Sequence, residues 1–283
     1  MPLFRFCSIK LNNKVGIKLG VSRISSYLCS RLAIIVMIQI SNLKKSFGET
    51  KACDIPSLTI NDGDLLGLVG NNGAGKTTLF RLMLDLLQAD SGNVTYTFPS
   101  SVDGGVGEVV AIDPSQSEDW KQSTAAHIDD SFLIDYLTPE EYFAFLAKLS
   151  GMPQHEVDER LKDFEHFAGG EVLGQKKLIR NLSAGNKQKV GIIAALIRQP
   201  KLVILDEPFN FLDPTSQSIL KRMLTDYNKQ TGATILLSSH NLQHTIDISS
   251  RIVLLEKGVV ISDIVNDSDE ARQQLVDYFE EKA

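Results

Sequence analysis

The sequence has few cysteines, a single tryptophan and no long apolar run. Its three cysteines, Cys7, Cys29 and Cys53, are odd in number and have no paired spacing. This pattern excludes a disulfide framework and a cysteine zinc site, and it fits a reducing compartment. The most apolar stretch, Leu32–Ile40, is far shorter than the roughly 20 apolar residues that a membrane-spanning helix needs. The chain is therefore not expected to cross a membrane unaided.

Acidic residues are missing from the first 36 positions. Lys and Arg give that segment a charge of +6, and since the whole chain carries −6, the rest carries −12. A nucleic-acid-binding surface needs clustered Lys and Arg. The acidic charge of residues 37–283 therefore counts against nucleic acid as a partner.

Residues 1–36 form a basic leader that differs in composition from the rest of the chain. The strand-like alternation Ile38-Gln39-Ile40 begins directly after Met37. This boundary favours native translation from Met37, with the leader as an upstream extension. A mobile basic tail is one alternative. A targeting peptide is the other, although the leader has no apolar h-region or small-residue cleavage site.

Residues 37–283 alternate short apolar strands with helical patterns, which predicts an α/β fold with a mostly parallel sheet. Three continuous apolar runs have the length of buried strands: Leu65–Val69, Leu202–Leu205 and Thr234–Leu237. Lys76–Leu87 instead repeats its apolar residues with the period of a helix.

The segment from about 130 to 187 contains helical patterns without an intervening strand. Thr138–Gly151 and Glu156–Phe167 both read as amphipathic helices, which predicts an inserted helical subdomain. Near the end of the chain, Arg251–Leu255 and Val259–Ser262 predict a hairpin, an antiparallel portion of the fold. A final helix is predicted over Ser268–Phe279.

A glycine-rich stretch follows the strand that ends at Val69. It matches the P-loop pattern G-x-x-x-x-G-K-[ST] with Gly70, Asn71, Asn72, Gly73, Ala74, Gly75, Lys76, Thr77 and Thr78. The glycines let backbone N–H groups approach phosphate oxygens, and the following helix directs its positive N-terminus at the same place. Lys76 is expected to bind the β- and γ-phosphates, and Thr77 to ligate Mg²⁺.

Two carboxylates end the apolar strand Leu202–Leu205. Asp206 and Glu207 are expected at the carboxyl edge of the sheet, where α/β folds bind ligands. Alternation along the strand directs the two side chains differently. Asp206 can therefore face a metal ion while Glu207 faces an attacking water as the general base.

A third motif, Leu182-Ser183-Ala184-Gly185-Asn186, precedes this strand, with Ser183 as the expected N-cap of a helix that runs to Ile197. Together with the P-loop and the Asp-Glu pair, in this order, it resembles the signature Leu-Ser-Gly-Gly-Gln of ATP-binding subunits of ABC transporters. The resemblance runs from about Met37 to Asp263, and it is nearest to bacterial exporter-type subunits around Leu137–Phe143 and Lys187–Lys189.

The resemblance implies an ABC ATPase domain over residues 37–283, with ATP and Mg²⁺ as cofactors. It implies that Phe47 stacks on adenine, with simple core packing as the alternative, and that His240 is the switch histidine contacting the γ-phosphate. Asp213 lies in the loop through which two ATP sites communicate. The signature residues Ser183, Ala184 and Gly185 are implied to contact the ATP of a second subunit.

The resemblance also implies partners and a location. The chain would act as half of a dimer on the inner, cytoplasmic face of the cell membrane and drive a separate permease, with export as the expected direction. The alternative from another class is a soluble ABC-type ATPase without a membrane partner, for example in iron–sulfur assembly. One P-loop and one signature are present, and no sustained heptads occur, which disfavours the ribosome-acting and DNA-acting relatives.

The sequence departs from the family pattern at three positions. Ala184 replaces the first signature glycine, which is compatible with a helical backbone at this position, and Asn186 replaces glutamine. The glutamine expected before Leu137 is replaced by Asp129. A carboxylate can still bind a water on Mg²⁺, so Asp129 is a candidate metal-site residue beside Thr77 and Asp206.

Overall fold

The structure is a computed structural model that describes residues 37–102 and 105–280. The predictions about residues 1–36 lie outside this part of the chain. Within the described ranges, no helix combines the length and apolar character needed to span a membrane.

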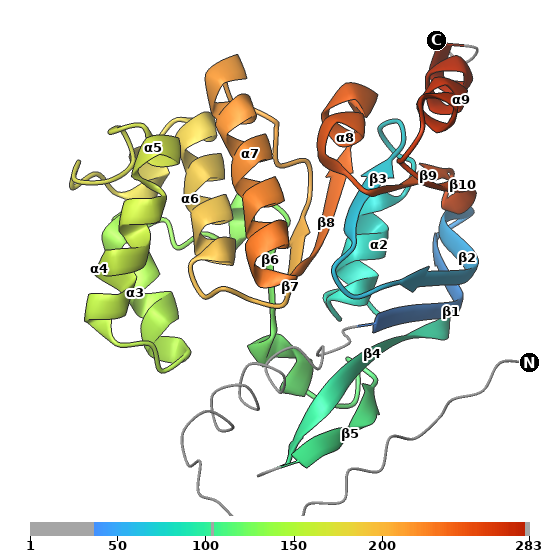
Figure 1. Ribbon diagram of the computed structural model, residues 1–283, viewed down its shortest axis with the longest axis horizontal. Coiled ribbons are helices and arrows are strands. Elements are labelled where there is room, and N and C mark those ends of the chain that lie inside the picture. Colours follow the sequence, from blue (N-terminus) through green and yellow to red (C-terminus); the bar gives the residue numbers. More distant parts are fainter. Residues whose placement is uncertain (1–36, 103–104, 281–283) are drawn as a thin grey trace, which may run out of the picture. The chain divides into compact units, whose positions relative to one another are not determined.

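The larger of two sheets has six strands in the order β10-β9-β3-β8-β7-β6 (Figure 1). They are β3 (Leu65–Val69), β6 (Thr124–His127), β7 (Leu202–Leu205), β8 (Thr234–Ser239), β9 (Arg251–Glu256) and β10 (Val259–Val265). Neighbours from β9 to β6 pair in parallel, whereas β10 pairs antiparallel with β9. Every residue of β3, β7 and β8 is buried, as expected for strands covered on both faces. The predicted mostly parallel sheet and the late hairpin are confirmed.

The smaller sheet is antiparallel, with the order β2-β1-β4-β5. Its strands are β1 (Met37–Phe47), β2 (Thr50–Ile60), β4 (Ser91–Val102) and β5 (Gly105–Ile112). Ile38, Ile40 and Ile55 of this sheet share one apolar core with Leu68 of β3 and Phe80. This core attaches the antiparallel sheet to the strand that precedes the P-loop.

A helical segment lies between β6 and β7. It contains α3 (Pro139–Leu149), α4 (Gln154–Asp163), α5 (Glu165–Ala168) and α6 (Ala184–Leu196), with short 3-10 turns at Asp130–Phe132 and Ile179–Asn181. Figure 1 shows α3, α4 and α5 grouped beside α6 and α7 (Pro214–Thr231). Thr138 begins α3 with a capping box to Glu141. The predicted helical insertion is therefore present.

Two helix boundaries differ from the sequence prediction. The helix α2 spans Lys76–Met83 and ends before the predicted Leu87, because Asp85 has a left-handed backbone with φ 53° that no α-helix continues through. The helix predicted over Glu156–Phe167 is divided at Phe164 into α4 and α5.

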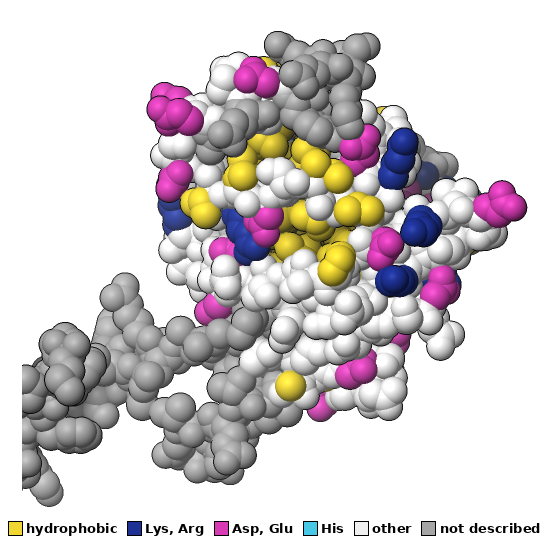
Figure 2. Space-filling view, turned by 90° about the vertical axis from the view of Figure 1, so that its right-hand side faces the viewer, with side chains coloured by type: hydrophobic (Ala, Val, Ile, Leu, Met, Phe, Trp, Pro, Cys, Tyr) yellow, Lys and Arg dark blue, Asp and Glu magenta, His cyan; other side chains and the backbone are white. Residues whose placement is uncertain are grey.

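The last two helices of the described residues are α8 (Leu242–Ile248) and α9 (Asp269–Glu280), the latter agreeing with the predicted final helix. Figure 2 shows apolar side chains gathered on the face that contains β10. The exposed large apolar residues of this edge strand are Val259, Ile261 and Val265.

Candidate functional site

The P-loop connects β3 to α2, where the sequence predicts it. Gly75 has φ 105°, and a Cβ there would lie 2.3 Å from the carbonyl oxygen of Ala52. A Cβ at Gly70 would lie 2.3 Å from the carbonyl oxygen of Leu255. Only glycine therefore fits these two positions without moving backbone. Of the other loop residues, Asn71, Asn72 and Gly73 are exposed, Ala74 is buried, and Thr77 and Thr78 are half-buried.

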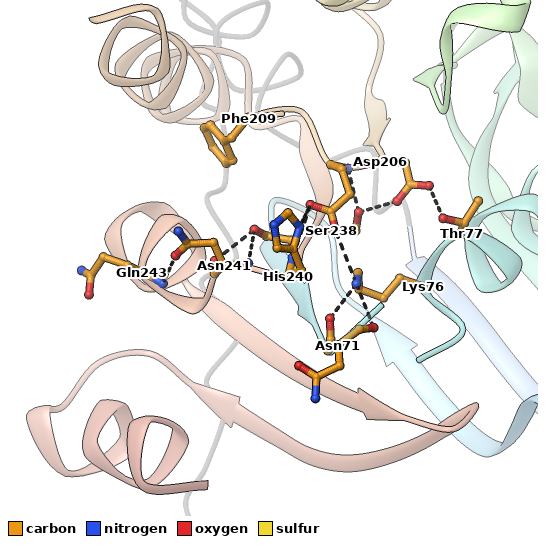
Figure 3. A network of polar contacts seen from close by, with 12 residues as sticks. Asn71, Lys76, Thr77, Asp206, Phe209, Ser238, His240, Asn241 and Gln243 are labelled. Carbon is orange, nitrogen blue, oxygen red and sulfur yellow. Dashed lines mark hydrogen bonds and ion pairs between the residues drawn. The ribbon is translucent and has the colours of Figure 1, made fainter. Parts of the chain in front are cut away.

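Lys76 is the charged residue at the centre of the site and is only 6% exposed. Its Nζ donates to the carbonyl oxygens of Gly70 at 2.6 Å and Asn71 at 3.4 Å (Figure 3). It also lies 3.3 Å from Oε1 of Glu207, which follows β7. The P-loop and the Asp-Glu pair are thus in direct contact through Lys76 and Glu207, which are 131 positions apart in the sequence.

Asp206 joins the P-loop helix to β8. Thr77 Oγ1 donates to Asp206 Oδ2 at 2.5 Å, and the hydroxyl of Ser238 donates to Asp206 Oδ1. Burial raises the pKa of the Asp206 carboxyl, and the hydrogen bonds from Ser238 and Thr77 oppose that rise. A hydroxyl and one carboxylate are oxygen ligands of the kind that Mg²⁺ takes together with phosphate and water. The Thr77–Asp206 pair therefore fits the predicted metal site.

Glu207 has a strained backbone and a carboxylate with two basic neighbours. Its φ of 47° lies in the left-handed region, which is unusual for a residue with a side chain. Its N–H donates to Ser238 Oγ at 2.8 Å. Its Oε2 lies 2.8 Å from Nδ1 of His240 and accepts the His240 N–H at 3.3 Å (Figure 3). The structure thus brings the two predicted catalytic residues, Glu207 and His240, together with Lys76.

The signature motif starts α6. Ser183 is the N-cap, as predicted, and its Oγ accepts the Asn186 N–H at 3.3 Å. Ala184 is the first helical residue, so the helical backbone expected for this replacement is present. A Cβ at Gly185 would lie 2.6 Å from the carbonyl oxygen of Phe211, so the loop after β7 requires a glycine here. Among the described residues, no hydrogen bond or ion pair joins Ser183 to the P-loop.

Three predicted site residues lie at the margin of this arrangement. Phe47 ends β1 with 53% exposure, and Lys45 Nζ lies 5.7 Å from its ring centroid. Asp213 is the N-cap of α7, and a hydrogen bond from Ser216 lowers the pKa of its carboxyl. The stacking and communication roles of these two residues stay predictions.

Asp129, the third of them, is bound to groups other than the Thr77–Asp206 pair. Its Oδ2 accepts a hydrogen bond from Nη2 of Arg81 in α2 at 3.0 Å, and its Oδ1 accepts a hydrogen bond from the Ser131 N–H. The described residues contain no cluster of three or more His, Cys, Asp or Glu that could hold a metal ion. The metal role of Asp129 stays a prediction, and the structure gives this carboxylate a guanidinium partner.

Sequence reasoning missed three polar residues behind the site. Ser238 contacts both Asp206 and Glu207. His127, at the end of β6, and Gln188, in α6, are buried and hydrogen-bonded to each other at 3.1 Å. A hydroxyl at the carboxyl end of a buried strand was the available signal for Ser238. Nothing local in the sequence marks His127 and Gln188 as a pair.

A glycine-rich loop between a parallel strand and a helix, with a buried lysine facing an Asp-Glu pair, defines a P-loop nucleotide-binding protein of the α/β class. The family model for ABC transporters matches residues 53–210, more than half of the chain. The chain belongs to the ABC transporter family, as an ATP-binding subunit.

Curated relatives support this assignment. The chain is 32% identical over 223 residues to the ABC transporter ATP-binding protein YhaQ of Bacillus subtilis (strain 168), covering 78% of this chain and 69% of YhaQ. It is 30% identical to the tungstate uptake system ATP-binding protein TupC of Peptoclostridium acidaminophilum, covering 80% of this chain and 97% of TupC. It is 29% identical to the methionine import ATP-binding protein MetN of Rhizobium johnstonii, covering 80% of this chain but 60% of MetN.

Solved structures agree with the fold. A solved ATP-binding subunit of an ABC transporter is 26% identical and aligns with a TM-score of 0.69 over 85% of this chain and 93% of the other. The ATP-binding cassette MJ0796 was solved as a dimer bound to ADP and phosphate. It aligns with a TM-score of 0.68 over 82% of this chain and 99% of MJ0796, at 21% identity. The predicted fold class, an α/β P-loop NTPase with a mostly parallel sheet, is confirmed.

Proposed function

We propose that this chain hydrolyses ATP with Glu207 as the general base, and that hydrolysis drives a separate membrane permease from the inner, cytoplasmic face of the cell membrane. The contact between Lys76 and Glu207 carries the proposal, because it places a carboxylate directly beside the predicted phosphate-binding lysine. His240 on the other Glu207 oxygen supports the same assignment.

Each residue has a distinct part in this proposal. Lys76 and the P-loop N–H groups would bind the phosphates, and Thr77 and Asp206 would hold Mg²⁺, which would supply positive charge to the phosphate oxygens. Glu207 orients a water and accepts its proton. His240, 2.8 Å from Glu207, orients that carboxylate toward the γ-phosphate position.

We further propose a head-to-tail dimer. Ser183 is exposed at the start of α6 and has no polar contact with the P-loop of its own chain among the described residues. A helix N-terminus with an exposed hydroxyl suits a phosphate presented by a second subunit. The MJ0796 cassette, of the same fold, was solved as a dimer, which supports dimerisation.

The direction of transport is a separate proposal. The Leu137–Phe143 region favours export, whereas TupC and MetN are named as uptake and import proteins. Uptake and efflux assays with the permease would decide between the two directions. The relatives' names also favour a transporter over a soluble ABC-type ATPase. Co-purification of the tagged chain from its native membranes with an integral membrane protein is expected; recovery without one would support the soluble alternative.

The first test of the base is Glu207→Gln, which keeps the size of the side chain but cannot accept a proton. We expect kcat for ATP hydrolysis to fall by about 10²–10⁴ while ATP binding persists. Glu159→Gln, on the exposed face of α4, is the matched control and should keep wild-type turnover. Hydrolysis by Glu207→Gln within a few-fold of wild type would remove Glu207 from the mechanism.

A further inference from the structure

We infer that Gln188 is a positioning residue that, together with His127, sets the orientation of Glu207 from the signature helix. The inference rests on the proposed role of Glu207 as base. It assigns a function to a buried polar pair that lies behind the site and contacts the backbone of Asp206 and Glu207.

The backbone of Glu207 needs external support. A left-handed φ of 47° costs free energy for any residue with a Cβ and persists where surrounding contacts hold it. Its N–H is held by Ser238 Oγ at 2.8 Å. Its carbonyl oxygen accepts the Asn210 N–H at 3.1 Å within the turn and Gln188 Nε2 at 3.2 Å from α6. Gln188 is thus the contact that ties this strained residue to the signature helix.

The orientation of Gln188 is determined by its two neighbours. A carbonyl oxygen only accepts, so the amide nitrogen of Gln188 must face Glu207, and Oε1 then faces His127. His127 Nε2 therefore carries the proton and donates at 3.1 Å. The chain of donors runs from His127 through Gln188 to Glu207.

The packing around the pair matches this role. His127 is 4% exposed and Gln188 is 6% exposed. A Cβ at Gly191 of α6 would lie 2.1–2.5 Å from three atoms of the His127 ring, so a glycine is needed for the ring to contact the helix. The His127 carbonyl also accepts the Asp206 N–H at 2.9 Å. The strand β6, the helix α6 and the turn at Glu207 are therefore joined through one amide.

This linkage relates the signature to the base within one chain. Ser183 caps α6 at its first turn, and Gln188 lies one turn further along the same helix. A displacement of α6 would move the amide that holds Glu207. Engagement of the signature would thereby affect the orientation of the general base in the same subunit.

The test uses Gln188→Met, which keeps the length of the side chain but has no N–H donor. We expect kcat for ATP hydrolysis to fall by about 10- to 100-fold, the scale of a misplaced reacting group. The Kd for ATP should change by less than about 3-fold, because no phosphate-binding group is altered. Gln230→Met, at an exposed position of α7, is the matched control. Equal losses of kcat and of ATP affinity would indicate general disruption and overturn the inference.

Two further measurements separate positioning from packing. In the Glu207→Gln background, Gln188→Met should cause no additional loss, because the group that it positions is already inactive. His127→Phe keeps a flat ring but cannot donate, and combined with Gln188→Met it should cost no more than the larger single effect. Additive losses in either double variant would contradict the chain of contacts. His127→Phe also tests the link if Gln188→Met does not fold.

The outcomes distinguish this inference from the proposed function. A large loss in Glu207→Gln with wild-type turnover in both Gln188→Met and His127→Phe would refute the positioning role and leave the base intact. Wild-type turnover in Glu207→Gln would refute the base, and the positioning role with it.

Discussion

At the scale of single residues, Lys76 is the charged side chain that links the P-loop to Glu207. Its ammonium group is nearly buried, and it contacts two P-loop carbonyls and the Glu207 carboxylate. Such a group is retained in a buried position because its hydrogen bonds and its ion pair compensate the loss of water. Lysine supplies a compact charge at this position, which suits the phosphates of a nucleotide.

Lys76→Ala should weaken the binding of ATP itself and not only slow the hydrolysis step. A charge-assisted hydrogen bond contributes about 1.5–3 kcal/mol, so the Kd for ATP should rise by about 10- to 100-fold in calorimetry. Lys229→Ala, at an exposed position of α7, should bind ATP as wild type does. Equal affinities in the two variants would refute the phosphate-binding role of Lys76.

Cys53 provides a pH-dependent prediction at the same scale. Burial on β2 raises the pKa of its thiol from 9.0 to about 12. Between these values the unfolded chain releases the proton and the folded chain keeps it, so this residue's contribution to stability falls as the pH rises. The comparison uses a Cys7→Ser/Cys29→Ser background. Between about pH 8 and about pH 10.5, the free energy of unfolding measured with urea should fall more for the protein that keeps Cys53 than for its Cys53→Ala variant. Parallel losses in the two proteins would contradict this assignment.

At the scale of elements, the strand β3 and the helix α8 approach each other unusually closely. A Cβ at Gly67 would lie 1.8 Å from Cγ2 of Thr245 and 2.7 Å from Oγ of Ser249. The strand β8 ends next to His240, and α8 begins two residues after it. The missing side chain at Gly67 thus lets α8 pack directly on the strand that leads into the P-loop.

Gly67→Ala should destabilise the protein by about 1–3 kcal/mol, the usual cost of overpacking a core. Thr245→Ser removes the methyl group that the new Cβ meets first, so the double variant should recover part of this loss. Thermal unfolding of the wild type, both single variants and the double variant measures the recovery. A double variant less stable than Gly67→Ala would show that another contact limits this packing.

At the scale of the whole molecule, the proposed head-to-tail dimer would bring the exposed signature of one chain to the P-loop of the other. If the proposed dimer forms, each ATP site takes Lys76 and Glu207 from one subunit and Ser183 from the other. The acidic charge of residues 37–283 gives no support to a nucleic-acid partner.

A mixing experiment tests the shared site. Ser183→Arg and Lys76→Ala chains should each be nearly inactive alone, whereas their heterodimer has one site with both lesions and one with neither. ATP hydrolysis should partly return on mixing. Cysteines placed near Ser183 and Gly73 provide a second readout, and with ATP they should crosslink between chains. Crosslinks formed only within a chain would refute the head-to-tail dimer.

The sequence alone determined the features that consist of contiguous residues. The P-loop, the Asp-Glu pair and the signature are each local, and each follows a strand or begins a helix whose pattern is visible in the sequence. Parallel strands carry their carboxyl ends to one edge of a sheet, so the meeting of Lys76 with Glu207 follows once the strands are recognised. The end of α2 before Asp85 was less predictable, because a local left-handed backbone angle decided it.

Only the tertiary structure decided which distant residues touch. The strand β8 lies between β3 and β7, which places Ser238 against the Asp206 carboxylate and the backbone N–H of Glu207. His127 meets Gln188 across 61 positions, and Gly67 meets Thr245 between β3 and α8. Asp129 lies against Arg81. Such contacts depend on strand order and on how closely a helix approaches a sheet. Neither property leaves a periodic or local trace in the sequence, because both result from the packing of side chains that are far apart along the chain.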